Sequence, residues 1–351
     1  MSDAPSDRSD PANTQKLDTQ AVADYLADKI DGFAGPVEAE KFQVGQSNPT
    51  FLLRTPAANY VLRRKPPGQL LKSAHAVDRE FRVQAALADT PVPVPRVHHL
   101  CEDDGVIGSM FYVMEALDGV NHNLPTLPGG SNDLRRGVTD EMNRVLAALH
   151  DVDIAAVGLS DYGPPGNYFE RQIGRWTKQY RASETVPVAA MDTLIDQLPQ
   201  AIPADDGQRT LVHGDYRIDN MIFERDGPRC LGVLDWELST IGHPYADLAA
   251  VIMQWQMPEG PEGRGLAGVD RAAQGLPTDA EFIAAYCDRR GLAGIPDFGF
   301  YLAFSFFRMT GIIQGVLKRA LDGNASNPAR GRQMGQYVPV FAEAGLRALD
   351  R

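Results

Sequence analysis

Residues 211–220 read Leu-Val-His-Gly-Asp-Tyr-Arg-Ile-Asp-Asn, and residues 230–237 read Cys-Leu-Gly-Val-Leu-Asp-Trp-Glu. Between them, an apolar run at 221–223 and an Asp-Gly pair at 226–227 are typical of a β-hairpin, in which a tight turn joins two strands. Such a hairpin would hold three polar side chains at one edge: Asp215, Asn220 and Asp235. The spacing therefore predicts that these side chains form one site.

These residue types are the ones that phosphoryl transfer requires. One carboxylate accepts or orients the proton of the acceptor hydroxyl, while an amide oxygen and a second carboxylate hold Mg²⁺ against the phosphates. Protein kinases place Asp, four residues and then Asn in their catalytic loop, with a metal-binding Asp at the end of a later strand. An Asp and an Asn at this spacing alone are usually a turn or a helix cap, so the prediction depends on the whole set. We predict Asp215 as the catalytic base, and Asn220 and Asp235 as metal ligands.

The stretch also departs from protein kinases in two ways. It has His-Gly-Asp in place of His-Arg-Asp, and Asp-Trp-Glu in place of Asp-Phe-Gly. With His-Pro-Tyr-Ala-Asp at 243–247, these strings resemble the aminoglycoside phosphotransferase and choline kinase superfamily. Two longer strings, Arg-Gln-Ile-Gly-Arg-Trp at 171–176 and Leu-Asp-Trp-Glu-Leu-Ser-Thr-Ile-Gly-His-Pro at 234–244, resemble the kinase-like domain fused to certain acyl-CoA dehydrogenases.

The resemblance covers residues 19–321 and implies an α+β, two-lobed protein-kinase-like fold, with a small antiparallel-sheet N-lobe and a mainly helical C-lobe. It also implies ATP-dependent phosphorylation of a small-molecule hydroxyl group, with ATP and Mg²⁺ as cofactors. We expect a disordered tail, a nucleotide-binding N-lobe, and a C-lobe with the catalytic loop, metal site and substrate-binding helices, at 1–15, 16–117 and 118–351, respectively. Two residues are expected to support the catalytic loop structurally: His213 and Asp247.

Backbone groups of the N-lobe are expected to bind the nucleotide at two places. Residues 42–53 read as strand, polar turn and strand, and in the family this turn lies over the phosphates, where small side chains let N–H groups approach. An ordinary hairpin turn is an equally good interpretation of its three polar or small residues: Gly45, Ser47 and Asn48. Residues 114–119 resemble the hinge between the lobes, where the backbone of Glu115 and Leu117 would bind the adenine edge.

The cation that grips the phosphates is expected on a strand at 59–64. The family pattern aligns Arg63 with the phosphate-binding lysine of protein kinases, and Glu80 on the following helix is its expected partner. The rival for the cation is Lys65, although Pro66 follows it and ends the strand. For Glu80, an ordinary surface charge is the alternative interpretation.

The C-lobe is expected to be mostly helical. Thr139 is predicted to cap a helix whose apolar residues recur at helical spacing as far as Leu149. Residues 171–180 read as another helix, which carries three cations on one face: Arg171, Arg175 and Lys178. A solvated cationic face is the simpler interpretation, but the face and the adjoining Trp176 also suit an anionic substrate.

The sequence leaves the phosphate acceptor open. Residues 257–281 carry five acidic and two basic side chains, which mildly favours a cation such as an amino sugar. The cationic face at 171–178, together with apolar residues at 253–257, better suits an acyl group with an anionic carrier. The resemblance to the domain fused to acyl-CoA dehydrogenases points to a link with acyl-CoA metabolism. We therefore predict a hydroxyacyl or carboxylate acceptor, with an aminoglycoside or amino-sugar kinase as the alternative.

Composition narrows the partners and the compartment. The 351 residues include 34 Lys plus Arg against 46 Asp plus Glu, a net charge of −12, which disfavours binding to nucleic acid or to an anionic membrane. The three cysteines form no Cys-x-x-Cys pair, so reduced thiols and a cytoplasmic location are expected. The sequence leaves the oligomeric state open.

Residues 1–13 have no apolar core and are not expected to be a signal peptide. The apolar run at 298–316 contains Arg308, which predicts a buried helix rather than a membrane span.

Two other classes of function stay open. A noncatalytic nucleotide-binding module is one, but such modules usually lose one of the three key residues, which are all present here. A metal-dependent hydrolase using His213, Asp215 and Asp235 is the other, and it requires a richer cluster than seven scattered histidines supply.

Overall fold

The computed structural model describes residues 17–42, 48–66, 76–325 and 327–350. The chain divides into two compact units. The first, called the N-unit here, contains Met1–Asp89, Pro93–Asp118 and Leu234–Glu237. The second, the C-unit, contains Thr90–Val92, Gly119–Val233 and Leu238–Arg351. The short segment that carries Asp235 therefore belongs to the N-unit, although it directly follows a strand of the C-unit.

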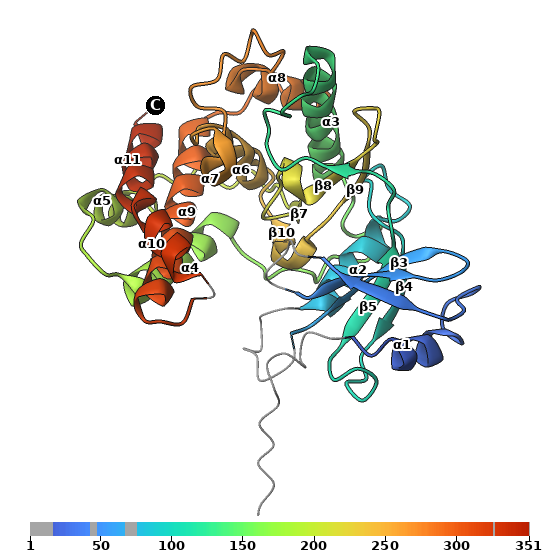
Figure 1. Cartoon of the computed structure of the whole chain (residues 1–351). Coiled ribbons are helices and arrows are strands. Elements are labelled where there is room, and N and C mark those ends of the chain that lie inside the picture. The colour runs from blue at the N-terminus through green and yellow to red at the C-terminus, as the bar shows by residue number, and fades with distance from the viewer. Residues whose placement is uncertain (1–16, 43–47, 67–75, 326, 351) are drawn as a thin grey trace, which may run out of the picture. The chain divides into compact units, whose positions relative to one another are not determined.

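The N-unit is built on a five-stranded antiparallel sheet with the strand order β1-β2-β3-β5-β4 (Figure 1). Its elements are α1 (Thr19–Leu26), β1 (Glu38–Lys41), β2 (Thr50–Arg54), β3 (Asn59–Arg64), α2 (Val77–Leu87), β4 (Val97–Cys101) and β5 (Phe111–Glu115). On one face of the sheet, Leu62 packs in a core that includes residues of α1, and on the other face Val61 packs with Val77 of α2. Because side chains alternate along a strand, Arg63 lies on the same face as Val61, toward α2.

The C-unit is mainly helical. Its helices are α3 (Asn132–His150), α4 (Tyr168–Ser183), α5 (Ala189–Gln197), α6 (Tyr245–Trp255), α7 (Gly260–Gly263), α8 (Asp279–Arg289), α9 (Phe298–Leu321), α10 (Pro328–Gly335) and α11 (Tyr337–Leu349). Two small antiparallel sheets accompany them, one with β7 (Thr210–Val212) and β10 (Thr240–Gly242), the other with β6 (Val120–Asn121), β8 (Met221–Phe223) and β9 (Cys230–Val233). The predicted hairpin is confirmed, because β8 and β9 pair antiparallel with Met221 opposite Val233.

The helix predicted to start at Thr139 starts earlier. Ser131 is the N-cap of α3, and its hydroxyl accepts a hydrogen bond from the N–H of Leu134. Thr139 lies inside the helix, where its hydroxyl donates to the carbonyl of Arg135 at 2.9 Å, so the predicted cap is wrong. The first two turns are mostly polar and contain Gly137, so their apolar residues are too few to show helical spacing in the sequence.

Helix α9 forms the centre of the C-unit. Among the described residues, it is the one helix long and apolar enough to cross a membrane by length and composition. However, 67% of its most apolar 18-residue stretch is buried inside the structure. It packs against helices α4, α6, α10 and α11. Arg308, in the middle of α9, is only partly buried, and its guanidinium binds the loop that follows β7.

Candidate functional site

The predicted site residues fall into two groups, one in each unit. In the C-unit, the buried strand β7 leads directly into residues 213–220, which we call the catalytic loop. Gly214 in this loop has φ +82°, and a Cβ at this position would lie 2.6 Å from the carbonyl oxygen of Leu238. Only glycine fits both conditions, which explains the His-Gly-Asp sequence physically.

The catalytic loop brings Asp215 and Asn220 together. The loop ends in a 3-10 turn at Ile218–Asn220. From this turn, the Asn220 side-chain amide donates to the backbone carbonyl of Asp215 at 2.9 Å and to its carboxylate Oδ2 at 3.1 Å. The spacing of four residues therefore closes a compact loop in which the carboxylate and the amide share one small region.

Asp247, in the first turn of α6, holds the backbone of the catalytic loop. Its side chain is buried, and it accepts hydrogen bonds from the N–H of His213 at 2.6 Å and of Gly214 at 2.9 Å. The His150 ring lies 3.6 Å from the same carboxylate. Burial alone would raise the pKa of Asp247, but the contacts with His150, His213 and Gly214 outweigh it and lower this pKa. His213 itself is buried, and its Nδ1 accepts the N–H of Asp215 at 3.2 Å.

Two arginines that the sequence analysis did not assign also contact the catalytic loop. Arg308 of α9 donates to the carbonyl of Gly214 at 2.7 Å. Arg217, inside the loop, lies with Nε 3.3 Å from Asp215 Oδ1 and with Nη2 3.0 Å from Asp219 Oδ2. An arginine in the middle of the apolar run at 298–316 is the sequence signal that could have identified Arg308.

The three cations predicted on one face of α4 have different surroundings. Arg171 is used locally, because its Nη1 donates to the carbonyls of Pro165 and Gly166 beside a pocket of about 150 Å³. Arg175 and Lys178 are exposed. Trp176 differs from them, since the guanidinium groups of Arg175 and Arg308 lie 5.7 and 5.8 Å from the centre of its ring. Trp176 and Arg175 are thus linked to the catalytic loop through Arg308.

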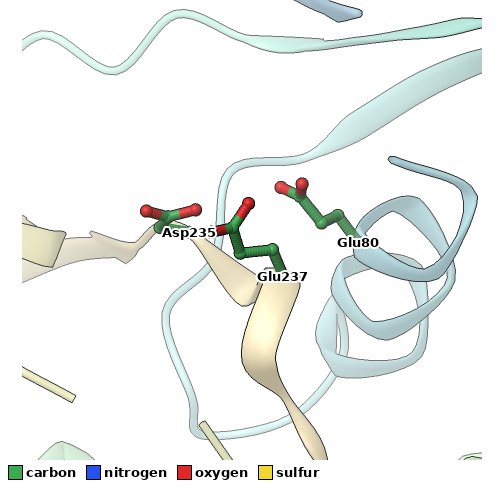
Figure 2. A group of neighbouring side chains, drawn as sticks. All are labelled: Glu80, Asp235 and Glu237. Atoms are coloured by element: carbon green, nitrogen blue, oxygen red, sulfur yellow. The ribbon is translucent and has the colours of Figure 1, made fainter. Parts of the chain in front are cut away.

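In the N-unit, four charged side chains form what we call the charged cluster: Arg63, Glu80, Asp235 and Glu237. Arg63 Nε lies 2.9 Å from Glu80 Oε2, while its Nη2 lies 2.5 Å from Asp235 Oδ1 and 3.8 Å from Glu237 Oε2. Figure 2 shows the three carboxylates, which come from α2 and from the segment that follows β9. The rival cation Lys65 instead lies with its Nζ 3.7 Å from Oδ1 of Asp78. The geometry therefore supports Arg63 over Lys65.

The charged cluster has an excess of negative charge, with three carboxylates against one guanidinium. The pKa of Glu80 is raised to about 7: burial raises it most, Arg63 lowers it, and the charges of Asp235 and Glu237 raise it. Asp235 stands at φ +63°, in the left-handed region that aspartate tolerates better than most residues and that is often found at functional sites. One oxygen from each carboxylate lies within 4.8 Å of the others. Oxygen donors with net negative charge fit a hard divalent cation such as Mg²⁺.

The remaining nucleotide-binding predictions have mixed outcomes. Asn48 is buried, and its side-chain amide donates to Glu80 Oε1 at 2.9 Å, so it supports the charged cluster. Gly45 and Ser47 lie outside the described residues. The N–H of Glu115 donates to the carbonyl of Arg96 at 2.8 Å, so adenine could use this N–H only by replacing that bond. Leu117 is half-buried just beyond the end of β5.

Comparison with known proteins gives a consistent result. The model of the phosphotransferase enzyme family matches residues 38–296. Mouse acyl-CoA dehydrogenase family member 10 is 44% identical over 332 residues, a match that covers 94% of this chain and 31% of the relative. Human acyl-CoA dehydrogenase family member 11 is 39% identical over 355 residues, covering 99% of this chain and 45% of the relative. The chain thus spans less than half the length of these relatives.

Solved structures agree. A protein of Ralstonia eutropha, provisionally described as an aminoglycoside phosphotransferase, is 48% identical with a TM-score of 0.88, covering 95% of this chain and 99% of the other. Aminoglycoside phosphotransferase APH(4)-Ia, solved with ADP and hygromycin B, is 16% identical with a TM-score of 0.61, covering 93% and 98% of the two chains, and shows likeness of fold alone. The predicted fold class and the predicted resemblance are confirmed. The chain belongs to the phosphotransferase enzyme family.

Proposed function

We propose that this protein transfers the γ-phosphoryl group of ATP to a hydroxyl group of a small molecule. The observation that carries the proposal is the catalytic loop, in which Asp215 and Asn220 meet at 3.1 Å on a backbone that Asp247 holds by two hydrogen bonds. In this reaction the protein supplies positioning and charge stabilisation rather than covalent chemistry. Asp215 would accept or orient the proton of the acceptor hydroxyl as the phosphoryl group arrives.

The charged cluster would serve the phosphates. Arg63 would bind phosphate oxygens with its guanidinium fork, and Glu80 would hold that fork through its 2.9 Å contact. Asp235 and Asn220 are proposed as ligands of Mg²⁺, which when bound neutralises charge on the phosphates. Nucleotide binding also has support from fold relatives solved with ADP or AMP-PNP. Gly45, Ser47, Asn48 and the backbone of Glu115 and Leu117 stay predicted nucleotide contacts.

We further propose a hydroxyacyl or hydroxycarboxylate acceptor. Arg217 lies beside the Asp215 carboxylate, and Arg308 binds the carbonyl of the preceding residue, so cationic groups flank the predicted base. The acidic residues at 257–281, which had favoured a cationic acceptor, are largely engaged within the fold. Asp279 pairs with Arg271 at 2.6 Å, and Glu281 forms a capping box with Thr278 at the start of α8. The acyl-CoA dehydrogenase names of the longer relatives point in the same direction.

An acceptor profile tests this function. The purified protein would be incubated with Mg·ATP and matched pairs of compounds, each hydroxy acid or hydroxyacyl thioester beside its deoxy counterpart, together with kanamycin. Phosphorus NMR would detect a new phosphate ester, which we expect from the hydroxylated members only. Phosphorylation of kanamycin but of no hydroxy compound would overturn the acceptor.

The same profile separates the alternative classes of function. ATP binding without turnover on any compound would indicate a noncatalytic nucleotide-binding module. Phosphate release from esters without ATP would indicate a hydrolase. Either outcome would overturn the proposed kinase activity.

A further inference from the structure

The segment between α6 and α8 begins with a closely packed loop rather than an open one. Three backbone hydrogen bonds of 2.9 Å close residues 255–267 on themselves, from the N–H groups of Gly265, Leu266 and Ala267 to the carbonyls of Pro258, Trp255 and Met257, respectively. A Cβ at residue 265 would lie 2.0 Å from the carbonyl oxygen of Met257, so only glycine fits there. The loop therefore fixes the backbone direction at its tip, residue 264.

Arg264 occupies this tip in a conformation that favours glycine. It is the C-cap of α7 with φ +52°, in the left-handed region, where helix ends usually carry glycine because other side chains are strained. Glycines do stand on both sides of it, at 263 and 265. An arginine at such a position indicates that contacts of its side chain offset the backbone strain.

The side chain of Arg264 reaches the catalytic loop. Its Nη1 binds Oδ2 of Asp219, and the same oxygen lies 3.0 Å from Nη2 of Arg217. Arg217 Nε in turn lies 3.3 Å from Oδ1 of Asp215. Four groups of alternating charge thus run from the tip of the 255–267 loop to the predicted base. Asp219 is the link, and its side chain is only 9% exposed, so neighbouring solvent screens it weakly.

We propose that Arg264 is a positioning residue for phosphoryl transfer. It shares the charge of Asp219 with Arg217, which leaves Nε of Arg217 for the ion pair with Asp215. Without Arg264, the whole negative charge of Asp219 would act on Arg217. Arg217 would then be drawn toward Asp219, and its contact with Asp215 would weaken. Arg264 acts through Asp219 and Arg217 and has no contact of its own with the predicted base. The proposal rests on the proposed function, since it concerns the working geometry of Asp215.

The substitution Arg264→Gly tests this directly, because glycine relieves the backbone strain and removes only the side chain. We expect a melting temperature close to that of the wild type, because the relief of backbone strain at φ +52° offsets the loss of the ion pair with Asp219. Turnover should fall about tenfold to a hundredfold, the effect of a small misplacement of a reacting group, while the Michaelis constant for ATP stays within about twofold. Arg264→Lys should recover part of the loss, because lysine keeps the charge but not the fork.

Hydrogen exchange supplies a readout that needs no substrate. Peptides that cover residues 213–221 should exchange faster in Arg264→Gly, whereas peptides from α9 should not change. Glu262→Gln is the matched control, because Glu262 lies in the same loop but binds Gln333 at 2.6 Å, and it should behave as the wild type in every assay. A double variant with Asp219→Asn should lose little more turnover than either single variant.

The outcomes separate this proposal from the proposed function. Wild-type turnover and wild-type exchange in Arg264→Gly would overturn the role of Arg264. Additive losses with Asp219→Asn, or equal losses in Glu262→Gln, would also overturn it. A wild-type protein that transfers no phosphate would overturn the proposed function instead, and the exchange of residues 213–221 would still decide whether Arg264 orders the catalytic loop.

Discussion

In the C-unit the catalytic loop is held through its backbone, whereas in the N-unit the charged cluster is held through side chains. Asp247 accepts two loop N–H groups, and Arg308 binds a loop carbonyl, so peptide groups that cannot rotate away fix the position of Asp215. Arg63 and its three carboxylate neighbours are joined by ion pairs, and Asp235 remains 33% exposed. A bound nucleotide or metal could replace one partner in the ion pairs of the charged cluster. It could not replace the hydrogen bonds that hold the backbone of the catalytic loop.

The difference teaches where precision and adaptability are needed. A catalytic carboxylate needs a fixed position relative to its substrate. A phosphate and metal site can instead reorganise when highly charged ligands arrive, provided that its groups are already gathered. We therefore expect the two regions to respond differently to mutation. A change at the support of the catalytic loop should disturb the whole loop, whereas a change in the charged cluster should mainly lower the affinity for the ligand.

Removal of Asp247 should have the largest effect. Asp247→Ala leaves two buried N–H groups without their acceptor, which should lower the free energy of unfolding by about 3–5 kcal/mol. Turnover should be lost with it, because the loop loses its support. Urea denaturation measures the stability change. A variant with wild-type stability would contradict the role of Asp247 as the support of the loop.

Removal of Arg63 should mainly weaken nucleotide binding, with a loss of stability in the N-unit because the buried Glu80 loses its cationic partner. Arg63→Ala should raise the dissociation constant for Mg·ATP about tenfold to a hundredfold, since charge-assisted hydrogen bonds contribute about 1.5–3 kcal/mol. Lys65→Ala is the control and should change little, because Lys65 pairs only loosely with Asp78. Calorimetric titration would decide between them, and the reverse ranking would reassign the phosphate-binding cation to Lys65.

Stability should fall on the acid side through the support of the catalytic loop. Burial lowers the pKa of His150, and the contacts of Asp247 lower its pKa as well. Both groups therefore bind protons more readily when unfolded, so protonation favours unfolding as the pH falls. The His150 contribution is lost below about pH 6.5, the ordinary histidine pKa, and that of Asp247 below about pH 4. His150→Gln should flatten the upper part of this profile, and an unchanged slope between pH 7 and 5 would contradict the assignment.

The acceptor side should show the smallest effect. Arg175→Glu places a carboxylate beside Trp176, within reach of the field of Arg308. We expect the Michaelis constant for an anionic acceptor to rise several-fold while the affinity for ATP stays unchanged. The effect should be small because Arg175 is exposed, so that solvent and salt screen its charge. Arg347→Glu on the exposed side of α11 is the control, because it makes the same change of charge away from the predicted substrate face. Equal effects of both variants would indicate a general charge effect rather than a site.

Local patterns in the sequence predicted those parts of the site whose partners are near in sequence. The Asp-Gly turn and flanking apolar runs predicted the β8–β9 hairpin, and the spacing predicted that Asp215 and Asn220 lie in one site, where the structure brings their side chains to 3.1 Å. Contacts made across long separations could not be predicted in this way. Arg308 and Gly214 are 94 residues apart, and Arg264 and Asp219 are 45 apart, so only packing of the folded C-unit brings them together. Arg171 fell on the predicted cationic face, but carbonyls of the preceding loop engage it instead.

Phosphoryl transfer by Asp215→Asn tests the central claim most directly. Wild type and variant would be compared in the same phosphorus NMR assay with the best acceptor, and Mg·ATP affinity would be measured on the same samples. Asp226→Asn in the exposed β8–β9 turn serves as the control. We predict near-normal ATP affinity in Asp215→Asn and turnover reduced about 10²–10⁴-fold, the range for loss of one general base. Turnover equal to that of the wild type would remove Asp215 from the mechanism and contradict the account.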